Sequence, residues 1–106
     1  MDTLSIVTSA FNSEDTIQEF VKRASAAAAK NFQHHFEIII VNDGSGDRTL
    51  STLRGICARN KKCVVLSLSR NFGHHAALLC GLERARGEYI FLIDSDLEEA
   101  PELLSE

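Results

Sequence analysis

The sequence predicts an α/β fold built on a doubly wound, mostly parallel sheet. Four short apolar runs rich in β-branched residues alternate with stretches of helical periodicity of about 10–15 residues, which is typical of strands joined by crossover helices. The runs at residues 36–41 and 89–93 are almost continuously apolar, as expected for strands that are buried on both faces. The crossover connections are expected to be right-handed.

The chain order expected from these runs is β-α-β-α-β-α-β, followed by the start of a further helix. The strands are predicted at residues 4–8, 36–41, 64–68 and 89–93. Apolar side chains at three- and four-residue spacing, such as Ile17, Phe20 and Val21, predict the helices between them. Capping residues indicate the helix boundaries: Asn12 or Ser13 for the first helix, Asp47 for the second, Gly87 at the end of the third and Pro101 in the first turn of the fourth.

Length and composition restrict the class of protein. The 106 residues form one domain at most, and a net charge of -4 without a basic stripe argues against nucleic-acid binding. Cys57, Cys63 and Cys80 have no CxxC spacing, so we expect reduced, structural thiols and a cytoplasmic protein. No run approaches the roughly 20 apolar residues of a membrane span, and we expect no targeting peptide before the first strand. The sequence stops within a predicted helix, which suggests a piece of a longer protein.

Polar loops follow each predicted strand, at residues 9–13, 42–47, 69–75 and 94–99, whereas the opposite loops resemble plain connectors. Parallel strands place these polar loops on one edge, where open α/β sheets bind ligands. Asp94 and Asp96 lie one residue apart after the last strand, and their oxygens suit Mg²⁺ or Mn²⁺, which can hold a phosphate. An acid pair in this position could instead cap a helix.

Two further side chains at this edge suit a nucleotide. Asp43 could accept hydrogen bonds from a base N–H or from ribose hydroxyls, although an Asx turn that caps the next helix would also explain the residue. Arg70 could hold a phosphate in forked geometry. His74 and His75 are adjacent at the start of a helix and point in different directions, so we expect no metal shared between them.

Four stretches carry a resemblance to a known family: IVTSAFN at residues 6–12, IVNDGSGDRT at 40–49, SRNFGHHAAL at 69–78 and DSDLEEAPE at 94–102. In order and spacing they resemble the inverting family 2 glycosyltransferases of GT-A fold. The nearest similarity is to the branch of dolichol-phosphate mannosyltransferases and bacterial polyprenyl-phosphate glycosyltransferases. The resemblance covers nearly the whole chain and implies that residues 1–106 are the N-terminal, nucleotide-sugar-binding part of a GT-A domain.

The resemblance implies roles for residues on the base side of a nucleotide sugar. Asp43, with Asn42, would contact the base or ribose, and Ala10 and Phe11 would lie near the base. This chain departs from the family pattern in having Ser9 in place of a proline, Phe11 in place of a tyrosine and Asn42 in place of the first acid of a pair. Asp43 must therefore carry any negative charge at this point.

The resemblance also implies roles on the phosphate side. Asp94 and Asp96 would bind the divalent metal and, through it, the diphosphate of the nucleotide. Glu98 would lie beside this site, where the family has glutamine. Arg70 and Gly73 would lie near the donor phosphates or the acceptor phosphate.

The implied activity is metal-dependent transfer of a sugar from a UDP- or GDP-linked donor to a polyprenyl phosphate, such as undecaprenyl or dolichyl phosphate, in cell-wall or lipopolysaccharide biosynthesis. In the family the general base follows the metal motif, so the catalytic residue is expected beyond residue 106 and the isolated chain is expected to be inactive. The full-length protein would associate with the cytoplasmic face of the membrane. We also expect the last strand to leave an exposed edge that pairs with another copy.

Other classes of protein use similar motifs. A phosphotransferase of the haloacid dehalogenase kind has its Asp-x-Asp after the first strand, and a sugar nucleotidyltransferase needs a glycine-rich basic loop that residues 9–13 lack. The main alternative is a non-catalytic nucleotide- or metal-binding module of receiver type, with acids at the same sheet edge. Such a module would have a lysine after a late strand, and none of the predicted strand ends supplies one.

Overall fold

Strands and helices alternate along the chain as the sequence predicts. The computed structural model describes residues 3–10, 16–44, 48–70 and 72–93. The elements in chain order are β1 (Leu4–Ala10), α1 (Ile17–Phe32), β2 (Phe36–Asn42), α2 (Thr49–Arg59), β3 (Cys63–Ser67), α3 (His74–Arg84) and β4 (Tyr89–Leu92). All four predicted strands are therefore confirmed, with slightly different ends.

The predicted cap at the end of the third helix is wrong. α3 ends at Arg84, and the N–H of Ala85 donates to the Gly81 carbonyl at 3.1 Å. The N–H of Gly87 instead donates to Ser5 Oγ at 2.8 Å, and a Cβ on Gly87 would lie 2.6 Å from the Ser5 nitrogen. This glycine is required by its close approach to β1, not by a helix end. The other predicted caps lie outside the described residues: Asn12, Ser13, Asp47 and Pro101.

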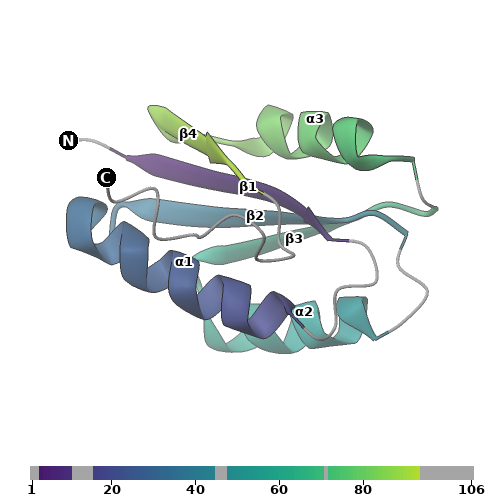
Figure 1. The fold of residues 1–106 in the computed structure, drawn as a ribbon, viewed down its shortest axis with the longest axis horizontal. Helices are drawn as coiled ribbons and strands as arrows, with labels where there is room; N and C mark the ends of the chain where they lie inside the picture. Colours follow the sequence, from purple (N-terminus) through teal and green to yellow (C-terminus); the bar gives the residue numbers. More distant parts are fainter. Residues whose placement is uncertain (1–2, 11–15, 45–47, 71, 94–106) are drawn as a thin grey trace.

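The four strands form one parallel sheet in the order β3-β2-β1-β4 (Figure 1). Ile6 of β1 pairs with Ile38 of β2 on one side and with Phe91 of β4 on the other. Figure 1 shows α1 and α2 on one face of the sheet and α3 on the other. This arrangement confirms the predicted doubly wound α/β class, and it places the ends of β1, β2 and β3 at one edge.

The main core lies between the sheet and the α1–α2 layer. Ile6 and Ile38 are fully buried there in one cluster with Ile40, with Phe20 of α1 and with Leu53 of α2. Each strand contributes alternate side chains to this cluster, because successive side chains of a strand point to opposite faces of the sheet. Burial of these large apolar side chains is the main stabilising contribution.

α3 packs very closely on the other face of the sheet. An ideal Cβ on Gly81 would lie 2.5 Å from Val7 Cγ1 and 3.2 Å from Val41 Cγ2, so a larger residue would push the helix away from the strands. Ala77, one turn earlier in α3, is also fully buried. Both faces of β1 and β2 are therefore covered, which accounts for their nearly continuous apolar sequences.

β4 is not buried on both faces, contrary to the prediction from its sequence. Tyr89 is 54% exposed, Ile90 47% and Leu92 46%. In the described part of the chain β4 pairs only with β1, and α3 packs mainly on β1 and β2. An apolar run shows that a strand can be buried, but its burial also requires neighbours. The exposed edge agrees with expectation, and its pairing with another copy stays a prediction.

Candidate functional site at the carboxyl edge of the sheet

Asp43 lies at the centre of the candidate site, directly after β2. The residue is only 3% exposed, and its N–H donates to the Ala10 carbonyl at the end of β1 at 2.8 Å. On the other side of β2, the N–H of Leu68 donates to the Asn42 carbonyl at 2.9 Å. These bonds extend the sheet past the strand ends, so the loops after β1, β2 and β3 begin next to one another.

The carboxylate of Asp43 holds the loop that follows β3. Its Oδ1 accepts a hydrogen bond from the N–H of Phe72 at 2.8 Å, and its Oδ2 accepts one from the N–H of Gly73 at 3.1 Å. Gly73 immediately precedes α3, so the carboxylate lies at the positive end of that helix dipole. The sequence predicted either a ligand contact or a turn within the Asp43 loop. It did not indicate this link to another loop.

The backbone of this edge needs glycine at two positions. Gly44 has φ of +66°, and Gly73 has φ of +100° and ψ of 155°, a region that residues with a side chain rarely adopt. Nothing lies within 4 Å of an ideal Cβ on Gly73, so conformation and not space requires glycine there. Asn42 is 2% exposed, and its Nδ2 donates to Ser67 Oγ at 3.3 Å.

Arg70 and Phe72 form an exposed pair on the same loop. The guanidinium carbon of Arg70 lies 4.7 Å from the centroid of the Phe72 ring, within the range of a cation–π interaction. Phe72 is 48% exposed and Arg70 is exposed, so this edge offers both a cation and an aromatic face to solvent. His75, in the first turn of α3, is exposed as well.

The structure brings together some, but not all, of the predicted site residues. Ala10, Asn42 and Asp43 are adjacent and buried, and Asp43 contacts the loop that carries Arg70 and Gly73. Four predicted site residues lie outside the described part of the chain: Phe11, Asp94, Asp96 and Glu98.

The metal-binding part of the prediction is not tested by the described residues. Ile93, which directly precedes Asp94, is 4% exposed, and its N–H donates to the Val7 carbonyl at 3.2 Å. Among residues 3–10, 16–44, 48–70 and 72–93, no three His, Cys, Asp or Glu side chains are grouped as a metal site would need.

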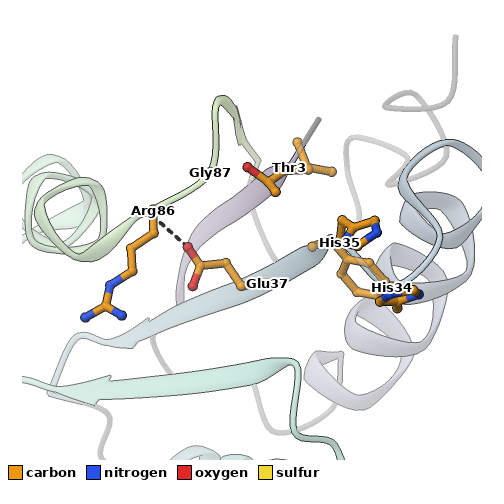
Figure 2. Close-up of a pocket in the computed structure, with 8 residues that line it drawn as sticks. Thr3, His34, His35, Glu37, Arg86 and Gly87 are labelled. Atoms are coloured by element: carbon orange, nitrogen blue, oxygen red, sulfur yellow. Dashed lines mark hydrogen bonds between the residues drawn. The ribbon is translucent and has the colours of Figure 1, made fainter. Parts of the chain in front are cut away.

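The opposite, amino edge of the sheet has a pocket of about 260 Å³, which the sequence did not predict. Figure 2 shows Glu37 near its centre, between Arg86 and the pair His34 and His35. Glu37 Oε2 accepts hydrogen bonds from Ser5 Oγ at 2.6 Å and from the Arg86 N–H at 2.8 Å (Figure 2, dashed line). The carboxylate thus joins β1, β2 and the connection to β4, which is a structural task.

The pKa values of His35, Cys57 and Cys63 are shifted by their surroundings. The rings of His34 and His35 lie 4.1 Å apart, and burial, the charge of His34 and the charge of Lys62 lower the pKa of His35. Cys57, Cys63 and Cys80 are free thiols in the structure. Burial raises the pKa of Cys57 and raises that of Cys63 to about 12, and the neighbouring Cys57 adds to the increase at Cys63.

The fold and the carboxyl-edge site define an α/β domain of the nucleotide-binding class, with its polar loops gathered at one edge of a parallel sheet. Residues 5–106 match the profile of Glycosyl transferase family 2, and the chain belongs to that family. Membership favours the glycosyltransferase interpretation over the dehalogenase, nucleotidyltransferase and receiver alternatives. In the described part of the chain, no helix is long and apolar enough to cross a membrane.

Similar proteins support this assignment. The chain is 50% identical over 101 residues to a protein of Mycobacterium tuberculosis that has a general glycosyltransferase name. It is 38% identical over 100 residues to an undecaprenyl-phosphate 4-deoxy-4-formamido-L-arabinose transferase of Pseudomonas fluorescens. These matches cover 95% and 93% of the chain but only 29% of each relative, so the chain spans less than a third of their length.

Solved structures with the same fold include proteins captured with nucleotide sugars. S. aureus TarS 1-349 in complex with UDP-GlcNAc has a TM-score of 0.75 and 31% identity, over 89% of this chain and 26% of that one. The mannosyltransferase PcManGT of Pyrobaculum calidifontis, in complex with GDP-Man and Mn²⁺, has a TM-score of 0.83 over 98% of this chain and 30% of that one. Its 20% identity makes it a likeness of fold alone.

Proposed function

We propose that residues 1–106 form the donor-binding part of a glycosyltransferase that moves a sugar from a nucleotide diphosphate to a polyprenyl phosphate. The observation that carries this proposal is the gathering of Ala10, Asn42, Asp43 and the Arg70 loop at one sheet edge, in a member of family 2. The names of relatives that act on undecaprenyl phosphate support the acceptor class.

The base and ribose of the donor would lie at the ends of β1 and β2. Ala10 and Asn42 pair directly across the two strands, and Phe11 and Asp43 follow them in the sequence. The buried, polar Asn42 gives this point of the edge a hydrogen-bonding side chain inside an otherwise apolar layer. Contacts at the ends of β1 and β2 would determine whether the donor is linked to UDP or to GDP.

The phosphates of the donor would lie toward the loop after β3 and the segment after β4. Arg70 is exposed at this edge, and its planar guanidinium suits phosphate oxygens. Gly73 lets the backbone turn there, and Glu98 would lie beside the phosphates.

Asp94 and Asp96 have a donor set that fits a divalent metal. Both are hard carboxylate oxygen donors, the kind that Mg²⁺ and Mn²⁺ prefer. When bound, such an ion neutralises the negative charge that develops on the departing nucleoside diphosphate. The task of the two aspartates is to hold the ion beside the phosphates.

Acceptor binding and proton removal would be performed by further sequence. The chain spans less than a third of its relatives, so we propose that the general base and the polyprenyl-phosphate site are supplied outside these 106 residues. The whole protein would then act at the cytoplasmic face of a membrane, and residues 1–106 alone would bind donor without transferring sugar.

The proposal is tested by calorimetric titration of this chain with UDP, GDP and UDP-GlcNAc, each with and without Mn²⁺. Asp96→Ala should reduce the metal-dependent affinity at least about tenfold, the loss expected when one charged hydrogen-bonding or metal-binding partner is removed. Glu88→Ala is the matched control, because Glu88 is an exposed acid at the amino edge. Binding that needs no metal and survives in Asp96→Ala would remove the metal function, and no binding at all would overturn the donor assignment.

A further inference from the structure

We infer that Asp43 is a positioning residue, which fixes Arg70 for a diphosphate instead of contacting the nucleotide with a free carboxylate. The inference rests on the proposed function, because it names how one part of the donor site is held in place. It starts from the two hydrogen bonds that the Asp43 carboxylate accepts from the loop after β3.

The carboxylate of Asp43 is already occupied and enclosed. Each of its oxygens accepts a backbone N–H, from Phe72 at 2.8 Å and from Gly73 at 3.1 Å, and the residue is 3% exposed. A ligand that used the same oxygens would have to displace a backbone donor, which would then be left unpaired at a cost. The geometry therefore favours a structural role for this side chain, which is to hold the loop after β3.

The two hydrogen bonds hold the backbone of the loop segment that also positions Arg70. The Phe72 nitrogen is held by Asp43, and the ring of Phe72 lies under the Arg70 guanidinium at 4.7 Å. Gly73, held by the other oxygen, is in a conformation with φ of +100° and directly precedes α3. The buried Asp43 carboxylate thus restricts the position of the exposed Arg70, because it holds the backbone two and three residues further along the chain.

Such restriction improves binding of a diphosphate. A free arginine side chain occupies many rotamers, and ordering it on binding reduces affinity. Arg70, stacked on the ring of a residue whose backbone N–H is anchored, has lost part of that freedom before the ligand arrives. An aspartate suits this anchor because two N–H donors need two acceptor oxygens, whereas asparagine would turn one NH₂ group toward a backbone N–H.

The anchor itself can be tested without any ligand. In the wild-type chain, hydrogen exchange at the Phe72 and Gly73 amides should be slow, because both N–H groups donate to the Asp43 carboxylate. Asp43→Asn should accelerate exchange at both amides, while Glu88→Gln should leave both unchanged. Unaltered Phe72 and Gly73 amides in Asp43→Asn would overturn the inference at its first step.

A double-mutant cycle tests the second step, with inorganic pyrophosphate and UDP as probes. Asp43→Asn and Arg70→Ala should each weaken binding about tenfold, and the double variant should be no weaker than Arg70→Ala. Losses that multiply in the double variant would show that Asp43 acts independently of Arg70 and would overturn the inference.

Phe72→Leu keeps both backbone hydrogen bonds and removes only the half-exposed ring, so it tests the role of the ring in a chain that should fold. It should weaken pyrophosphate binding several-fold without changing the hydrogen exchange of the Gly73 amide. Wild-type affinity in this variant would overturn the claim that the Phe72 ring positions Arg70. Failure of the wild-type chain to bind either probe would overturn the proposed function, whereas the amide measurements would still decide whether the anchor exists.

Discussion

Replacement of Gly81 by alanine tests how tightly α3 is packed on the sheet. The added Cβ would lie 2.5 Å from Val7 Cγ1 and 3.2 Å from Val41 Cγ2. Both valines are fully buried on adjacent central strands, and a β-branched side chain has little freedom at χ1. The valines cannot move aside, so the helix or the strands must shift.

The magnitude follows from two opposing effects. Overpacking of a rigid core costs up to about 3 kcal/mol. Alanine is favoured over glycine within a helix by about 1 kcal/mol. We therefore expect Gly81→Ala to lower the free energy of unfolding by about 2 kcal/mol, which corresponds to a fall of roughly 10 °C in Tm for a domain of this size.

Gly55, in the middle of α2, provides the matched control. The nearest atom to its ideal Cβ is an Arg59 nitrogen at 3.8 Å, an ordinary contact, so Gly55→Ala should show only the helix-propensity gain of about 0.5–1 kcal/mol. Urea unfolding of both variants, with unchanged m-values, would measure the difference. Val7→Ala should relieve the strain in the Gly81→Ala background, so that the two losses combine to less than their sum.

The reasoning would be refuted if Gly81→Ala were as stable as the wild type while Gly55→Ala behaved as expected. That result would mean that α3 can move away from β1 and β2 at no cost. The helix would then not be a fixed support for the loop that precedes it.

Three further variants test features of the amino edge and of the buried thiols. Ser5→Ala removes one partner of Glu37 and the acceptor of the Gly87 N–H, so urea unfolding should show a loss of about 1–3 kcal/mol, and a negligible loss would contradict the network. The pKa of Cys63 is raised from 9.0 to about 12, so above pH 9 the folded chain keeps a proton that the unfolded chain loses. The free energy of unfolding should therefore fall as the pH rises from 9 toward 12. In thermal melts, Cys63→Ala should flatten this pH dependence. The pKa of His35 is lowered from 6.5, so the unfolded chain binds the proton more readily, and stability should fall as the pH drops below 6.5; the same dependence in His35→Asn would exclude His35 as its source.

Local patterns were sufficient to predict the elements of the fold. Apolar periodicity placed the strands and helices, and alternation of the two predicted a parallel sheet. The burial of β4 was predicted wrongly, because an apolar sequence such as that of Ile90 and Leu92 does not say which neighbours are present. Gly87 was misread for a related reason: a glycine after a helix is typical of a cap, and its approach to Ser5 depends on a strand 82 residues earlier.

The candidate site was predictable as an edge but not as a set of contacts. Parallel strands bring the loops after β1, β2 and β3 together, and the structure places Ala10, Asn42 and Asp43 there as expected. The link from Asp43 to Phe72 and Gly73 joins residues 29 and 30 positions apart. Propensities and motifs describe residues that are close along the chain, so they cannot predict a contact between residues so far apart.

The position of β1 inside the sheet also has a consequence for the order of folding. β1, β2 and β3 pair successively with their neighbours in the chain, whereas β4 returns to the free side of β1, so that Glu88 bonds to Thr3 across 85 residues. Closing so long a loop slows the formation of a contact, so β4 should join the sheet last. Until residue 92 has left the ribosome, the apolar edge of β1 stays open to pairing with another chain, and synthesis is the period of greatest risk of aggregation.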